Sequence, residues 1–284
     1  MMRGCKFVAA IYCVVLLAAC ASRPPASATA TLAQASTQRG AQSFARGDME
    51  AAQREYLTAL RIAESLDDKP GRAAASLSLS RIASQSGRPA DALSAVNSVF
   101  AEKAFLPPAL LVTAHGRAAA LYLAEGKPQS LQQSSAQLAE ADALCAANCP
   151  DAGALLVLHA RLALAQQQTA IALKYANDAL ASAALAATTP PALNPQANAE
   201  RANALRVRAE AQLAGTQNEA AITSATEALQ LDRALGLADR VLLDLRLLSR
   251  AHQQAGAEQM ARHYETLAAR AQSAGQALRG AQAD

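Results

Sequence analysis

Small and apolar residues recur at helical spacing along most of the chain. Ala75, Leu79 and Ile82 fall on one face of a predicted helix, and leucines at positions 242, 245 and 248 do so near the other end. Spacings of three and four residues indicate amphipathic helices. Only 3% of the residues are aromatic and Trp is absent, which argues against a β-sandwich or barrel. The pattern therefore predicts an all-α protein.

Short breaks divide these helices at regular intervals. The predicted turn positions are 47, 87, 126, 167, 215 and 256, which are separated by 40, 39, 41, 48 and 41 residues. Gly87 and Gly126 are each followed two residues later by proline, the usual order of a helix end and a new helix start. We therefore predict about six helical hairpins over residues 32–275, with the fifth unit one residue longer and a loop or hinge at 187–195.

The first unit has the most specific sequence. Gly40 lies in its first helix, Gly47 at its turn, and Ala52, Tyr56 and Ala59 in its second helix. This arrangement resembles the tetratricopeptide repeat (TPR), a helix-turn-helix unit. The resemblance implies an α-solenoid of antiparallel helix pairs that stack into a right-handed superhelix, with a role in binding other proteins.

The N-terminal segment has the features of a secretion signal. Arg3 and Lys6 precede an apolar run, Phe7–Ala19, of 13 residues. This run is too short to cross a bilayer as a helix but fits the apolar core of a signal peptide. The run ends in Leu-Ala-Ala-Cys20, which resembles a bacterial lipobox. The resemblance implies that residues 1–19 are cleaved and that the Cys20 thiol carries lipid; the alternative is an ordinary signal in which the cysteine is coincidental.

The lipobox resemblance also implies an address. Ala21 follows the cysteine where aspartate would favour the inner membrane, so we expect a lipid-anchored protein on the inner leaflet of the outer membrane, facing the periplasm. Residues 20–31 are expected to be the lipidated cysteine and a flexible tether, and residues 276–284 a frayed tail. Removal of Arg3 and Lys6 leaves 26 − 2 = 24 basic and 23 acidic residues, a net charge of +1. Such a chain lacks the basic excess of a nucleic-acid-binding protein.

Two further cysteines remain in the expected mature chain. Three residues separate Cys145 from Cys149, and Pro150 follows directly. Proline disfavours the helical conformation in the residue before it, so this segment is predicted to be a helix end that turns into a loop. An oxidising compartment favours a disulfide between them. Free thiols stay open as the alternative, since the C-x-x-x-C spacing is not that of a redox motif.

No catalytic or metal-binding motif stands out in the sequence. The repeat register places His115, His159 and His252 at inward positions, which suggests hydrogen-bonded core residues, whereas His263 is expected to be exposed. Phosphate loops, nucleophile elbows and zinc motifs are missing. We therefore expect no enzyme, no metal and no small-molecule cofactor, and the only attached group would be the lipid on Cys20.

A row of arginines is the sharpest candidate for a binding site. Arg81, Arg161 and Arg250 share one repeat position in the first helix of their units, Arg208 joins them if the extra residue of the fifth unit is allowed for, and Arg117 lies three residues before the equivalent place. In the TPR family this position lines the concave peptide groove. Guanidinium groups there would suit carboxylates. The alternative is a solvated helix face.

The combined interpretation is a membrane-anchored periplasmic TPR scaffold for protein partners in envelope assembly or secretion. Two alternatives act by the same contacts, namely a regulator of a cell-wall synthesis enzyme and a pilotin-type lipoprotein for secretin or pilus assembly. A carrier of small molecules is a third class, although the sequence has no signature of a closed pocket.

Overall fold

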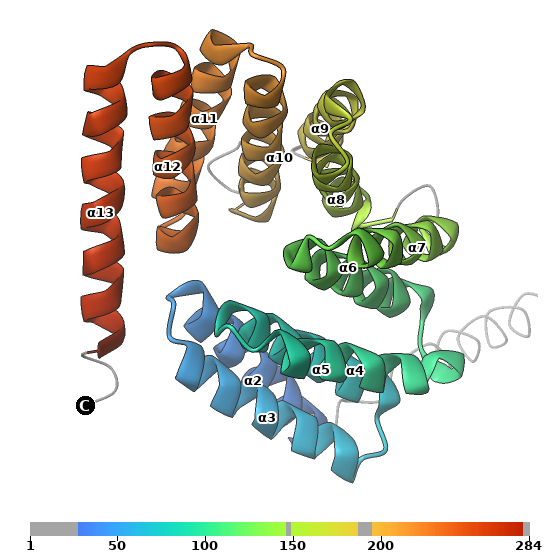
Figure 1. Cartoon of the computed structure of the whole chain (residues 1–284). Helices are drawn as coiled ribbons and strands as arrows, with labels where there is room; N and C mark the ends of the chain where they lie inside the picture. Colours follow the sequence, from blue (N-terminus) through green and yellow to red (C-terminus); the bar gives the residue numbers. More distant parts are fainter. Residues whose placement is uncertain (1–27, 146–148, 187–194, 281–284) are drawn as a thin grey trace, which may run out of the picture.

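The computed structural model describes residues 28–145, 149–186 and 195–280 as twelve α-helices and one short 3-10 helix (Figure 1). Cys20, the signal segment 1–19 and all but the last residue of the predicted loop at 187–195 lie outside these residues. The helices are α2 (Ala28–Ala45), α3 (Met49–Ser65), α4 (Lys69–Gln85), α5 (Pro89–Ala101), η2 (Lys103–Phe105), α6 (Pro108–Glu125), α7 (Pro128–Leu144), α8 (Ala152–Ala165), α9 (Thr169–Ala186), α10 (Pro195–Ala214), α11 (Asn218–Ala234), α12 (Ala238–Gln254) and α13 (Glu258–Gly280).

Consecutive helices form six hairpins, so the predicted number of repeats is confirmed. We call the first helix of each hairpin the A helix (α2, α4, α6, α8, α10, α12) and the second the B helix. From α4 onward each A helix packs against the next A helix, whereas no comparable contact joins successive B helices among the described residues. Because the A helices are the more closely spaced, they form the inner wall of a curved array, and the B helices form the outer wall.

Turn chemistry explains where the hairpins close. Gly47, Gly87, Gly126 and Gly256 have φ between +66° and +82°, a region that costs glycine little. The fourth turn uses Gln167 at φ +60°, as the sequence register predicts. The fifth prediction was wrong by one residue, because Thr216 and not Gly215 takes the left-handed conformation, at φ +59°.

Two predicted boundaries also differ from the structure. Helix α2 begins at Ala28, inside the stretch expected as tether, and helix α13 runs to Gly280, past residue 275. In the third repeat α6 ends at the residue directly before Gly126. The shorter turn moves the packed positions of α7 to Ser130 and Ser134.

Alanine dominates the core and lets the helices approach closely. It makes up more than half of the buried hydrophobic residues. Serine joins neighbouring helices at equivalent places: the hydroxyls of Ser80 and Ser249 donate to the carbonyls of Ala92 and Ala261, at 2.8 and 3.0 Å. A side chain at Gly40 would come within 2.9 Å of the Tyr56 ring, which explains the small residue there.

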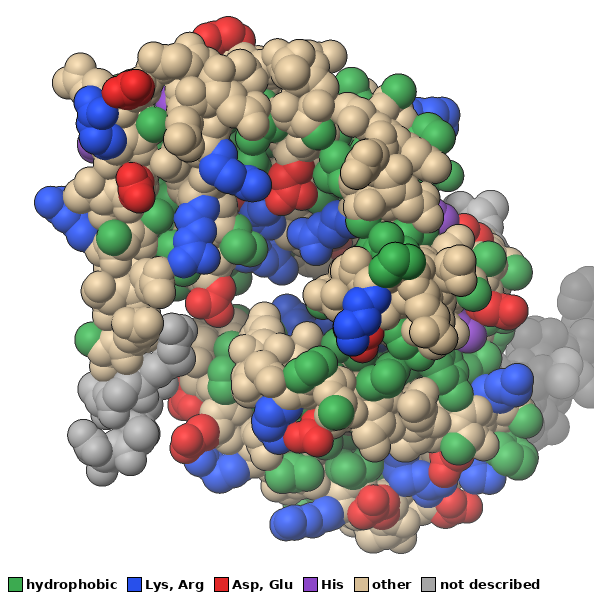
Figure 2. All heavy atoms as spheres, in the orientation of Figure 1, with side chains coloured by type: hydrophobic (Ala, Val, Ile, Leu, Met, Phe, Trp, Pro, Cys, Tyr) green, Lys and Arg blue, Asp and Glu red, His purple; other side chains and the backbone are tan. Residues whose placement is uncertain are grey.

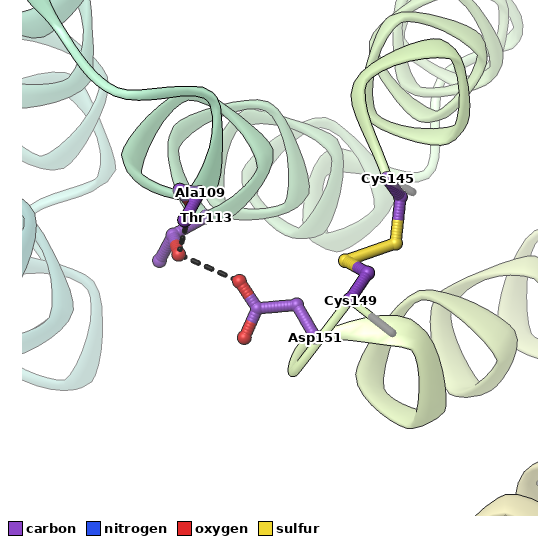
Figure 3. The surroundings of a disulfide bond; sticks show 5 residues. All are labelled: Ala109, Thr113, Cys145, Cys149 and Asp151. Atoms are coloured by element: carbon purple, nitrogen blue, oxygen red, sulfur yellow. Dashed lines mark hydrogen bonds between the residues drawn. A yellow bond between two sulfur atoms is a disulfide. The ribbon is translucent and has the colours of Figure 1, made fainter. Parts of the chain in front are cut away.

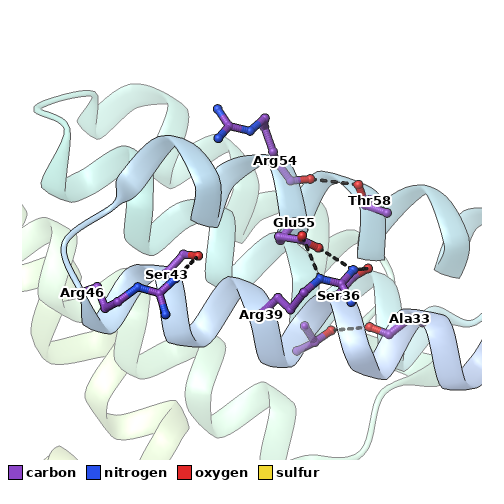
Figure 4. A network of polar contacts seen from close by, with 9 residues as sticks. Ala33, Ser36, Arg39, Ser43, Arg46, Arg54, Glu55 and Thr58 are labelled. Carbon is purple, nitrogen blue, oxygen red and sulfur yellow. Dashed lines mark hydrogen bonds and ion pairs between the residues drawn. The ribbon is translucent and has the colours of Figure 1, made fainter. Parts of the chain in front are cut away.

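The first repeat ends the array with a polar face. Arg39 forms a two-pronged ion pair with Glu55 of α3, at 2.8 and 2.9 Å, and also donates to Ser36 (Figure 4). The hydrogen bonds from Arg39 lower the pKa of the Glu55 carboxyl. A polar terminal repeat is what a solenoid needs to stay soluble, since no further repeat covers it.

A disulfide joins Cys145 and Cys149, whose Cα atoms are 5.2 Å apart, at the connection between α7 and α8 (Figure 3). Closing so small a loop stabilises by about 2 kcal/mol on the loop-entropy account. Asp151 follows this connection and accepts a hydrogen bond of 2.6 Å from the Thr113 hydroxyl of α6. The disulfide thus closes the segment that links the third repeat to the fourth.

Candidate binding groove

Five arginines of the inner wall belong to one hollow of the molecule. Figure 2 shows basic side chains around an opening between the α10–α13 half and the α2–α5 part of the array. We call this surface the arginine groove and define it by the arginines at 81 (α4), 117 (α6), 161 (α8), 240 and 250 (α12), together with Glu210 of α10.

The near end of the groove is formed by α4 and α6. The Arg81 guanidinium lies 3.9 Å from the centroid of the Phe44 ring. Burial, together with the like charges of Arg117 and Arg240, lowers the pKa of Arg81 to about 10. The Nε of Arg117 is buried without a hydrogen-bond partner in the described part of the chain. A buried donor left unpaired costs free energy.

Arg161 occupies the middle of the groove. Its side chain is exposed, yet burial is the main cause that lowers its pKa. The two observations together describe a concave wall, where water reaches the guanidinium while protein surrounds it on other sides. The negative charge of Glu210 on the next A helix opposes this shift, and the positive charge of Arg206 adds to it.

The far end of the groove contains a shallow cavity of about 360 Å³. Arg250, Gln254 and Glu210 supply its polar groups, while Leu164, Leu213 and Ala214 supply its apolar wall. Arg240 lies near the start of α12, the helix that carries Arg250, and donates to the carbonyl of Ala199 at 3.3 Å. Burial lowers the pKa of Arg240, and the carboxylates of Asp232 and Asp244 oppose that shift.

Ion pairing separates the groove arginines from the buried Arg206, but not from exposed arginines such as Arg61 and Arg270, which also lack a carboxylate partner among the described residues. Within the described ranges no carboxylate lies at ion-pair distance from any of the five, whereas Arg39, Arg72 and Arg206 each have one or two such partners. Clustered guanidinium groups without counter-ions attract carboxylates and phosphates. The groove can therefore bind an anionic segment.

The predicted place of Arg208 needs correction. The buried residues that flank Arg161 are Ala160 and Leu162, and their counterparts in the fifth repeat are Ala209 and Ala211. Glu210, not Arg208, thus takes the position of Arg161. Arg208 lies on the opposite side of α10 and donates from Nε to the Ser224 hydroxyl of α11, at 3.0 Å.

Sequence reasoning missed a buried ionic cluster behind the groove. Arg206 of α10 donates to Asp244 of α12 at 2.6 Å and to Asp232 of α11, and all three side chains are almost fully buried. Burial raises the pKa of Asp244 to about 6, although the hydrogen bond from Arg206 opposes this. The signal was present in the register, because other repeats have Leu77 or Val157 where Arg206 lies.

The histidines pack against aromatic rings. His159 stacks on Tyr175 and lies 2.9 Å from Asp142, and His115 lies 2.7 Å from Gln137 and beside Phe100. His252 stacks on Tyr264, and His263 is exposed, as the repeat register predicts. Across the described ranges, His, Cys, Asp and Glu form no group of three or more that could hold a metal ion. The same ranges contain no helix with the length and apolar character needed to cross a bilayer.

Fold and groove together define a TPR-like α-solenoid, a class that works as a scaffold for protein–protein contacts. Residues 31–101 match the family described as Tetratricopeptide repeat. The comparison with curated protein sequences gives no match.

Two solved structures share the fold. One is the crystal structure of a signal-transduction ATPase with numerous domains that carries a tetratricopeptide repeat sensor, from Pyrococcus horikoshii (TM-score 0.62, 14% identity); the alignment covers 90% of this chain and 36% of that protein. The second contains nearly identical TPR-like repeats from Podosopora anserina (TM-score 0.51, 21% identity), covering 73% of this chain and 97% of the other. At these identities the similarity concerns the fold.

Proposed function

We propose that this chain is a lipid-anchored scaffold on the periplasmic side of a bacterial outer membrane, which captures an acidic segment of a partner protein in the arginine groove. The observation that carries the binding proposal is the set of five groove arginines without described ion-pair partners. The observation that supports the address is the sequence Leu-Ala-Ala-Cys20 behind an apolar run of 13 residues.

The charge pattern of the groove limits which segment fits. Arg161 and Arg250 would each bind a carboxylate of the ligand, whereas Glu210, which lies between them, would repel one. The apolar wall of Leu164 and Leu213 would cover a small side chain of the ligand. We therefore expect a segment with separated acidic residues to bind better than an unbroken acidic run.

The binding proposal predicts a loss of partner when two groove arginines change. Arg161→Gln with Arg250→Gln removes two charge-assisted contacts, and we expect partner retention in pull-downs from envelope extracts to fall about tenfold or more. The matched control is Arg54→Gln with Arg262→Gln, because these arginines are 71% and 68% exposed on B helices and pair only within their own helix. Equal retention by both folded variants would refute the groove as the binding surface.

The anchor predicts covalent lipid at a single residue. The full chain, expressed in a Gram-negative host with labelled palmitate, should incorporate the label and fractionate with outer membranes. Cys20→Ser should abolish both, because the thiol is the attachment atom. A labelled Cys20→Ser variant, or an unlabelled parent chain, would contradict the proposed anchor.

A further inference from the structure

One edge of the solenoid exposes two large apolar side chains. We call it the inter-repeat edge, because the B helices end there and the next A helices begin there. Phe105, the last residue of η2, is 64% exposed, and Leu66, directly after α3, is 47% exposed. Isolated exposed apolar residues are ordinary, whereas apolar residues brought together by neighbouring loops mark a contact surface.

Polar contacts tie these two loops into one surface. The Arg72 guanidinium donates to Asp67 in the first loop at 3.0 Å and to Glu102 in the second at 2.7 Å. Lys69 lies 3.6 Å above the Phe105 ring. Lys103, two residues before Phe105, is exposed. We call Leu66, Lys69, Lys103 and Phe105 the edge patch; it presents apolar tips beside two ammonium groups, while Arg72 pairs with the neighbouring carboxylates of Asp67 and Glu102 and Asp68 caps the start of α4.

The start of the first helix lies at the same edge. The A helices run parallel to one another, so Ala28, where α2 begins, is on the inter-repeat side. Eight Cα–Cα steps separate Ala28 from Cys20, and a chain of this length spans at most about 29 Å. The opposite edge lies about 27 Å further away along the 18 residues of α2. An anchor at Cys20 would therefore join the folded array at its inter-repeat edge, about 27 Å from the hairpin turns.

We propose that the edge patch rests on the lipid bilayer, with Phe105 and Leu66 in the interfacial layer and the two lysines at the headgroups; this inference rests on the proposed lipid anchor. An aromatic ring and an aliphatic side chain bordered by lysines have the chemistry of interfacial contact, since the apolar tips enter the layer and the ammonium groups meet anionic lipid. The anchor and the patch together give the solenoid a fixed side toward the membrane.

The absence of Trp from the chain makes a direct test available. The mature lipidated protein with Phe105→Trp is reconstituted into vesicles of phosphatidylethanolamine and phosphatidylglycerol with brominated acyl chains. The control is Ile171→Trp, an apolar residue 46% exposed near the start of α9 at the opposite edge. We expect the introduced fluorophore at 105 to be quenched by brominated lipid, with emission shifted to shorter wavelength, and the one at 171 to be unaffected.

The other outcomes separate this proposal from the anchor. Protein that floats with the vesicles while both fluorophores escape quenching overturns the edge contact and leaves the anchor intact. A chain that carries no lipid and does not float overturns both. A shift of the emission of the tryptophan at position 105 to shorter wavelength that grows with protein concentration in the absence of brominated lipid also overturns the proposal. Such a shift indicates contact between copies of the chain.

Discussion

Replacing Arg206 with leucine is expected to lower the free energy of unfolding by about 3–5 kcal/mol. The change removes the only cation that contacts Asp232 and Asp244 within the described residues, and both carboxylates are fully buried. A buried charge without a partner costs several kcal/mol because it has lost its water. Urea unfolding followed by circular dichroism measures the effect.

The repeats themselves supply the control for this prediction. In other repeats the position of Arg206 is occupied by an apolar residue, Leu77 or Val157. The position of Asp244 is occupied by Ala75 or Ala204. The position of Asp232 is occupied by Ala63 or Ala183. The triple variant Arg206→Leu, Asp232→Ala and Asp244→Ala should therefore recover most of the lost stability. A single variant as stable as the parent would show that the cluster is not buried as described.

The second large effect is a pH dependence of stability caused by Asp244. Burial raises the pKa of this carboxyl from 3.8 to about 6, so the folded state holds its proton after the unfolded chain has released it. A raised pKa stabilises the fold below the unfolded value, and this contribution is lost as the pH rises through the folded value. The full shift corresponds to about 3 kcal/mol, of which about 2 kcal/mol is lost between pH 4 and pH 6.

The pH effect is isolated by a variant that cannot titrate. Unfolding free energies of the parent and of Asp244→Asn are measured from pH 4 to pH 7. The parent should lose stability relative to the variant as the pH rises, because asparagine has no proton to release. Parallel curves for the two proteins would contradict a raised pKa at this position.

The repeat architecture was predictable because the chain marks its turns locally. Glycine at a helix end and proline two residues later are signals of a single short segment, and they recur at Gly87 and Gly126. The predicted position of the fifth turn was wrong by one residue, also for a local reason. Gly215 stands beside Thr216, and the less usual residue takes the left-handed conformation.

The groove was predictable only in part, since its members come from distant segments. The shared register identifies Arg81, Arg161 and Arg250, but the error of one residue at the fifth turn assigned Arg208 in place of Glu210. Arg240 lies near the start of its helix and reaches the groove through the curvature of the array. The ionic cluster joins residues 26 and 38 positions apart, and no local pattern specifies such contacts.

Site-specific photo-crosslinking in cells tests most directly whether the inner wall captures the partner. A photoreactive residue at position 120 of α6, which shares the register of Arg81 and Arg161, is compared with one at the exposed position 135 of α7 in the same repeat. We expect a protein adduct from position 120 that disappears with Arg161→Gln and Arg250→Gln, and none from position 135. An adduct from position 135 alone, or one from position 120 that survives both arginine changes, would contradict it.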